Sequence, residues 1–202
     1  MSWDTLLAFS LFAMVTSITP GPNNLMLLAS GVNFGFRPTV PHMLGISSGF
    51  LVMAFAVGVG LAGVFTQLPW LYGVLKWVGT AYMLYLAWRI ANSAPPEDTA
   101  PGKQPANPLG FWGAAAFQWV NPKAWVMAVS GYSTYVPASS GLAVVAGAAL
   151  LFALINLPCV SMWALFGASL RNLLRVQRNL IAFNYGMAAL LVISLYPLLR
   201  AF

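Results

Sequence analysis

Six apolar stretches constrain this chain more than any other feature of its sequence. Each reaches or exceeds the roughly 20 residues that a helix needs to cross a hydrocarbon core about 30 Å thick. Of the 202 residues, 60% are hydrophobic and 6% are charged, whereas about 25% of residues are charged in soluble domains. The sequence therefore predicts an all-α integral membrane protein with six transmembrane helices. The predicted spans are residues 5–31, 40–65, 69–92, 109–131, 141–169 and 180–199.

Six spans leave little of the chain for any other domain. We therefore expect no extramembrane catalytic or nucleotide-binding domain, and a transport process would have to draw its energy from a gradient. The single cysteine, Cys159, excludes an internal disulfide and a paired-thiol electron relay. With one histidine, one cysteine and no acidic pair, an intramembrane enzyme or a metal site is not expected, and neither is a cofactor.

A polar, proline-rich segment at residues 93–108 divides the chain into two parts of three helices each, residues 1–92 and 109–202. Shifting the sequence by 100 residues places Pro22 on Pro122 within apolar segments that begin at corresponding positions. Because each part holds an odd number of spans, the second copy must be inverted relative to the first. Many secondary transporters have such inverted repeats and bind substrate near the midplane between the copies.

The distribution of lysine and arginine predicts the orientation. One side of the predicted bundle has only Lys76 and Arg200, and the other side has six positive residues. By the positive-inside rule, the six lie in cytoplasmic loops of a bacterial inner-membrane protein, and both termini lie outside. Since the net charge of +6 is scattered between spans, the lipid bilayer and not nucleic acid is the expected partner, and a homodimer is left open. The six residues are Arg37, Arg89, Lys103, Arg171, Arg175 and Arg178.

The first apolar stretch is interrupted by the run Ser-Ile-Thr-Pro-Gly-Pro-Asn-Asn-Leu at residues 17–25. Pro20 and Pro22 lack an N–H group and free the carbonyls of Thr16 and Ile18 from helical hydrogen bonding. Such carbonyls are tolerated at membrane depth only where protein or a water-lined cavity satisfies them. The run therefore predicts a broken helix 1 whose polar backbone faces a cavity.

The fourth apolar stretch contains a second predicted helix break, at Asn121 and Pro122, and Lys123 follows directly. Asn121 is a good N-cap, and proline suits the first position of a helix. Two half-helices would thus begin at one site. Their N-terminal N–H groups and the Lys123 ammonium suit a carboxylate, and freed carbonyls and amide oxygens suit an ammonium. The candidate substrate-binding residues are Pro20, Gly21, Pro22, Asn23, Asn24, Gln118, Asn121, Pro122, Lys123 and Asn156.

No proton carrier stands out in the sequence. Asp4, His42 and Lys123 are the candidates for proton coupling. His42 is first interpreted as an interfacial residue beside Arg37, with a proton relay as the second interpretation. Asn156 is expected to face the cavity from the fifth span.

These features resemble the LysE/RhtB family of amino-acid exporters. The resemblance rests on residues 19–24, on Gly-Phe-Arg at 35–37, on the closely spaced pair Gly45 and Gly49, and on Asn-Pro-Lys at 121–123. It implies export of amino acids or close derivatives by proton exchange. The glycine pair also predicts close helix packing.

The substrate is less strongly indicated. The fourth stretch and Ser-Thr-Tyr-Val-Pro at 133–137 look similar to members that export cysteine and O-acetylserine, and other members export lysine, arginine, threonine, homoserine or leucine. Asn156 stands where some members carry an acid, so a second positive charge would lack a partner and a neutral amino acid is favoured. A channel or exporter for another small polar metabolite and a non-transporting membrane subunit are the alternatives.

Overall fold

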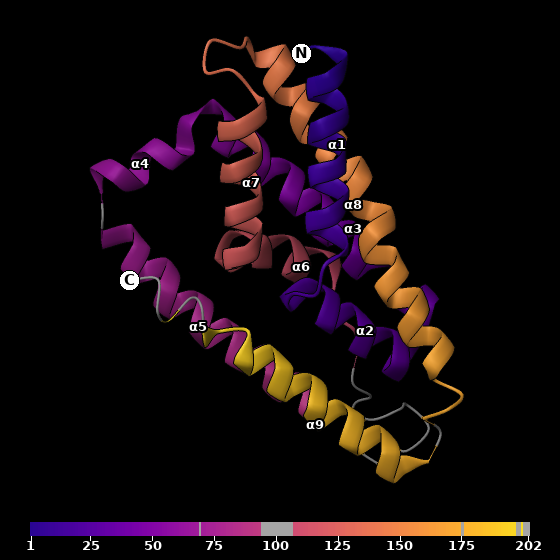
Figure 1. Ribbon diagram of the computed structural model, residues 1–202. Coiled ribbons are helices and arrows are strands. Elements are labelled where there is room, and N and C mark those ends of the chain that lie inside the picture. The colour runs from indigo at the N-terminus through magenta and orange to yellow at the C-terminus, as the bar shows by residue number, and fades with distance from the viewer. Residues whose placement is uncertain (69, 94–106, 175, 197–198, 200–202) are drawn as a thin grey trace.

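The computed structural model describes residues 1–68, 70–93, 107–174, 176–196 and 199. The regular structure within these ranges is helical throughout, which confirms the all-α prediction (Figure 1). Each predicted span coincides with helical structure. The elements are α1 (Trp3–Ile18), α2 (Pro22–Phe34), α3 (Phe36–Ala56), the π-helical turn η1 (Val57–Leu61), α4 (Ala62–Gln67), α5 (Trp70–Ala91), α6 (Phe111–Phe117), the 3₁₀ turn η3 (Gln118–Val120), α7 (Pro122–Tyr135), α8 (Leu142–Leu170) and α9 (Gln177–Ile193).

Two of the described helical segments are long and apolar enough to cross a membrane. They are Phe36–Leu61, which joins α3 to η1, and α8. A third candidate is the pair α1 and α2, which meet at an angle of 53° and can form one broken span. The remaining predicted spans are helical where described but do not reach the same length and hydropathy, so the six-span count stays a prediction.

The break between α1 and α2 follows from the local sequence. Thr19 ends α1 with an extended backbone, and Gly21 is also extended, with φ −179° and ψ 176°. Pro22 then occupies the first turn of α2, where its missing N–H costs nothing. The predicted break in helix 1 is therefore confirmed.

The predicted break in helix 4 is also present. The apolar stretch divides into α6, η3 and α7, and Asn121 has non-helical φ and ψ of −86° and 109° just before Pro122. From these two breaks, α2 runs toward one end of the bundle and α7 toward the other (Figure 1). The N-termini of the two half-helices consequently lie in the middle of the protein.

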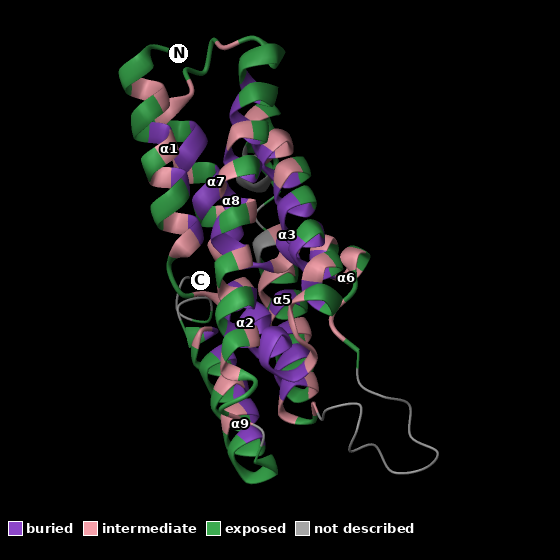
Figure 2. Ribbon diagram, turned by 90° about the vertical axis from the view of Figure 1, so that its right-hand side faces the viewer, coloured by how far each residue is buried: buried purple, intermediate pink, exposed green. Residues whose placement is uncertain are grey.

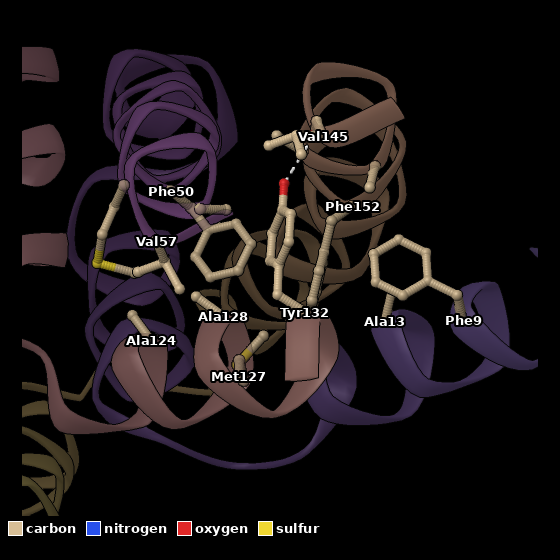
Figure 3. Packing of buried hydrophobic residues seen from close by; sticks show 14 residues of the cluster. Phe9, Ala13, Phe50, Val57, Ala124, Met127, Ala128, Tyr132, Val145 and Phe152 are labelled. Atoms are coloured by element: carbon tan, nitrogen blue, oxygen red, sulfur yellow. Dashed lines mark hydrogen bonds between the residues drawn. The ribbon is translucent and has the colours of Figure 1, made fainter. Parts of the chain in front are cut away.

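An aromatic core holds the α1, α3, α7 and α8 helices together on one side of the breaks (Figure 3). Phe152 packs edge-on against Phe9 and Phe50, with ring centroids 5.5 Å and 4.7 Å apart. The Tyr132 hydroxyl donates a hydrogen bond of 2.8 Å to the Val145 carbonyl, which ties α7 to the start of α8. Because these rings are rigid, they fix α7 and its N-terminal end relative to α1.

Glycines let α2 approach α8 closely, and they let α3 approach α6 closely. A Cβ at Gly31 of α2 would overlap the Ala164 carbonyl oxygen, and one at Gly167 of α8 would overlap the Leu28 carbonyl oxygen. Gly45 and Gly49 place α3 equally close to the backbone of α6. The close packing predicted from that pair is confirmed.

The α5 and α9 helices pack along each other, and α9 also packs against α2 (Figure 1). Asn33 of α2 and Asn184 of α9 exchange two amide hydrogen bonds of 2.7 and 2.9 Å, and both are buried. Asn184 also donates to the Ser93 carbonyl at 2.9 Å. This polar pair joins the first half of the chain to the second away from the break.

The outer surface of the bundle is apolar. Exposed residues cover the outward faces of the helices, and buried ones lie between them (Figure 2). A surface with so many exposed indole and aliphatic groups suits lipid tails better than water. Examples are Trp3, Trp77, Trp88, Trp112, Leu154 and Phe166.

Some residues on which the sequence predictions rest lie outside the described ranges. The predicted linker lies mostly within 94–106, and three of the positive residues used to predict orientation are also outside. They are Lys103, Arg175 and Arg200.

The glycine contact between α2 and α8 has a testable consequence. Gly167→Ala should lower the melting temperature by several degrees, because overpacking costs about 1–3 kcal/mol and 1 kcal/mol shifts the melting temperature of a chain this size by about 2–4 °C. Gly147 lies on the same helix, and a Cβ there meets open space. Gly147→Ala should therefore leave the melting temperature unchanged or raise it. Thermal unfolding of the detergent-purified variants measures both, and equal melting temperatures for the two would contradict the close contact.

Candidate substrate-binding site

A cavity with about 320 Å³ of empty volume lies at the break between α1 and α2. The α1, α2, α3, η3, α7 and α8 elements all contribute to its wall. The structure brings together here seven of the ten predicted binding residues, and the three prolines begin or flank the half-helices beside it. The seven are Gly21, Asn23, Asn24, Gln118, Asn121, Lys123 and Asn156.

Lys123 reaches from the start of α7 to the broken end of α1. Its Nζ donates to the Thr19 carbonyl at 2.6 Å, to the Thr19 hydroxyl at 2.9 Å and to the Pro20 carbonyl at 3.2 Å. Asn24 Nδ2 donates to the carbonyls of Ser17 and Thr19 at 2.9 and 2.8 Å. Carbonyls at the break are thus already held by an ammonium and an amide of the protein itself.

The two carbonyls that the prolines free are satisfied in the same way. The Thr16 carbonyl accepts from the Thr19 hydroxyl at 3.0 Å, and the Ile18 carbonyl accepts from Trp163 Nε1 at 3.0 Å. The sequence predicts that these carbonyls face a substrate, and the structure corrects this: side chains hold them. The hydrogen bonds remove the cost of leaving polar groups unpaired in an apolar bundle.

A pair of amides connects the two broken helices. Asn23 Nδ2 donates to Gln118 Oε1 at 2.8 Å, and Gln118 Nε2 donates back to Asn23 Oδ1 at 3.1 Å. Gln118 Nε2 also donates to the Ala114 carbonyl at 2.9 Å, and its side chain is fully buried. This reciprocal pair fixes the start of α2 against η3.

Asn156 faces the cavity from α8, as predicted. Its Nδ2 donates to Ser17 Oγ at 3.1 Å, and its Oδ1 accepts from Ser47 Oγ at 3.2 Å. Sequence reasoning missed both serines as functional residues. Ser47 lies between the two glycines of the close-packing pair, so its position on the packed face of α3 was the available signal.

The cavity is electropositive. Asn121 Oδ1 caps α7 by accepting from the Lys123 N–H at 3.1 Å, whereas no side chain caps the N-terminus of α2. The positive end of α2 and the Lys123 ammonium therefore meet in one place, which suits a carboxylate. No acidic side chain lines this cavity among the residues that the structure describes.

Only one of the three candidates for proton coupling lies in this cavity. Asp4 is exposed in the first turn of α1, at the far end of that helix from the break. His42 is 1% exposed within α3 and lines a different cavity. Its interpretation as an interfacial residue beside Arg37 stays a prediction, and the structure adds that His42 is buried between helices. Lys123 remains.

Comparison with known proteins identifies the kind of protein that has this site. A family model described as LysE type translocator matches residues 14–195. The chain belongs to the LysE translocator family. Cysteine/O-acetylserine efflux proteins of Escherichia coli (strain K12) and Shigella sonnei (strain Ss046) are each 37% identical to this LysE-type chain over 194 residues, which are 95% of the chain and 96% of each relative. No solved structure matches the chain.

The family match confirms the resemblance and the prediction of a transporter instead of an enzyme. The bacterial efflux relatives and the apolar helices place this LysE-type translocator in the inner membrane.

The reciprocal amide pair predicts strong coupling between two substitutions. Asn23→Leu leaves Gln118 Oε1 without its donor, although Gln118 Nε2 keeps the Ala114 carbonyl, and Gln118→Met leaves the half-buried Asn23 amide without its partner. A buried polar group without a partner costs about 1–3 kcal/mol. The double variant removes both amides and should be more stable than the sum of the single effects predicts, with a coupling energy of about 0.6–2 kcal/mol. Equilibrium unfolding of the four proteins in detergent measures this coupling. Additive single effects would show that the two amides do not depend on each other.

Proposed function

We propose that this chain exports neutral amino acids or close derivatives across the inner membrane in exchange for protons, and that the cavity at the α1–α2 break is its substrate site. One observation carries the proposal: the ammonium of Lys123, a residue that lines the cavity, sits on the Thr19 and Pro20 carbonyls of the break, and none of the described residues that line this cavity is acidic. Family membership and the efflux relatives support an amino-acid exporter.

The contacts of Lys123 suggest how a zwitterion binds. A substrate carboxylate draws the Lys123 ammonium away from Thr19 and Pro20, and it also meets the free N–H groups at the start of α2. The substrate ammonium then takes the place of Nζ on the same two carbonyls. This exchange replaces one ammonium by another, so both carbonyls have a donor again once the substrate is bound.

The preference for a neutral side chain follows from the cavity wall. Asn156 supplies an uncharged amide that is already bonded to Ser17 and Ser47. A lysine or arginine substrate would bring a second positive charge next to Lys123 with no carboxylate to pair with it. Unpaired like charges in a cavity of low polarity are costly.

Lys123 is also the proposed proton-coupling residue. Its ammonium contacts the Thr19 and Pro20 carbonyls and lies next to the proposed position of the substrate carboxylate. In an exchange, binding of the substrate from the cytoplasm accompanies loss of a proton there, and release of the substrate outside accompanies uptake of a proton. The substrate ammonium displaces Lys123 from the Thr19 and Pro20 carbonyls, so Lys123 can lose its proton when the substrate binds and take one up when it returns to these carbonyls.

The architecture proposed for this mechanism is a pair of inverted three-helix repeats, residues 1–92 and 109–202, joined by the linker at 93–108. Pro22 and Pro122 support it, because each begins a half-helix and these half-helices run to opposite ends of the bundle.

The proposed orientation places the α2–α3 and α8–α9 connections in the cytoplasm and both termini outside. Arg171 lies beside Gly35, so these two positively charged connections share one end of the bundle. Reporter fusions at residue 100 and at the C-terminus should give cytoplasmic and external signals respectively, and the opposite pattern would reverse the orientation.

Substitution of Lys123 tests the proposed site. Lys123→Met keeps the apolar stem but removes the charge, so export of O-acetyl-L-serine should fall at least about tenfold, equivalent to about 1.4 kcal/mol. Lys123→Arg keeps the charge but holds its proton, so it should bind substrate and lose dependence on a pH gradient. Efflux from proteoliposomes, with and without a pH gradient, measures both effects.

Lys76→Met is the matched control, because Lys76 lies on α5 and its Nζ bonds to the Leu199 carbonyl away from the cavity. Unchanged affinity and gradient dependence in Lys123→Met would show that Lys123 only packs at the break. Export of lysine as fast as O-acetylserine by the unmodified protein would contradict the neutral preference.

A further inference from the structure

A second cavity lies further along α2, between α2, α3, the end of α5 and the segment before α6. Its empty volume is about 390 Å³. Ser30, which lines it, is six residues from Asn24 of the first cavity, or about 9 Å along the helix. The residues that line it include Met26, Ser30, His42, Leu86, Arg89 and Leu109.

His42 is the first indication that this cavity takes a ligand. The side chain is 1% exposed, and neither ring nitrogen has a hydrogen-bond partner among the described residues. A buried polar group without a partner costs about 1–3 kcal/mol. An imidazole that lines a cavity with both nitrogens unused offers a donor and an acceptor to whatever occupies the cavity.

Arg89 brings a positive charge to the same cavity. It lies in the last turn of α5, and its Nη2 donates to the Asn107 carbonyl at 2.8 Å. That bond uses one of the five N–H donors of a guanidinium, whose planar fork matches a carboxylate.

Ser30 supplies the complementary acceptor. The Thr39 hydroxyl donates its only hydrogen to the Gly35 carbonyl at 2.8 Å, so in the 2.7 Å contact between Ser30 and Thr39 the serine is the donor. The Ser30 oxygen consequently keeps its lone pairs for a further donor. Ser30 and an imidazole nitrogen can thus accept from an ammonium.

The walls between these polar groups are apolar. Met26, Leu86 and Leu109 line the cavity, and no acidic side chain does so among the described residues. A small zwitterion with a short uncharged side chain fits this combination of one cation, two acceptors and apolar walls.

We propose that the second cavity is a second amino-acid binding site, in which Arg89 holds the carboxylate and Ser30 and His42 hold the ammonium. The inference rests on the proposed function and deepens it. In the proposed orientation this cavity is at the cytoplasmic end of α2, so an exported amino acid occupies it before it passes α2 to the site at the break.

Binding stoichiometry tests the second site directly. The full chain, purified in detergent, is titrated with radiolabelled O-acetyl-L-serine. The unmodified protein should bind two equivalents, and Arg89→Gln and Lys123→Met should each bind one. Arg89→Lys, which keeps the charge, should recover part of the lost equivalent. Lys76→Gln removes a charge from the same helix away from the cavity and should still bind two.

The outcomes separate this site from the proposed function. One equivalent in the unmodified protein, kept in Arg89→Gln and lost in Lys123→Met, would overturn the second site and leave the exporter standing. No saturable binding together with no efflux of O-acetyl-L-serine would overturn both. Because the unmodified protein alone distinguishes two equivalents from one, the test does not depend on a variant that folds poorly.

Discussion

The hydrogen bonds from Lys123 Nζ to the carbonyls of Thr19 and Pro20 are the interaction on which the rest of this structure depends. Two prolines and a glycine interrupt the helix and leave backbone oxygens without helical partners in a membrane protein, where unpaired oxygens are costly. The ammonium comes from the other half of the chain, so the same bonds that make the break tolerable also join the halves. They further specify what can replace the lysine, namely another ammonium.

The α2 helix acts as a partition between two cavities, and polar pairs position it near both ends. Asn23 binds Gln118 at its start, and Asn33 binds Asn184 near its finish, each through two reciprocal amide bonds. Between these pairs, Gly31 lets α8 approach to backbone contact. Satisfied buried amides are directional and do not slide as apolar contacts can. Such an arrangement suits a helix past which a substrate moves.

The local features of the fold could be predicted from the sequence, because proline and N-cap effects act within one turn. The breaks before Pro22 and Pro122 and the clustering of most of the proposed binding residues follow from them. Long-range partners could not be predicted, since helix packing decides them: Trp163 of α8 donates to the Ile18 carbonyl at the break, and Ser47 of α3 donates to Asn156. The burial of His42 could not be predicted for the same reason. A neighbour in sequence does not show which face of a helix is buried.

The most direct test of this account restores the broken helix. Replacing Pro20, Gly21 and Pro22 together with alanine allows continuous helical hydrogen bonding, because alanine is the strongest helix former. The Thr19 and Pro20 carbonyls would then no longer be available to Lys123 or to a substrate. Efflux of O-acetyl-L-serine from proteoliposomes, normalised to the amount of inserted protein, should be lost while insertion is unchanged. Efflux at the rate of the unmodified protein would contradict a binding site built from the break.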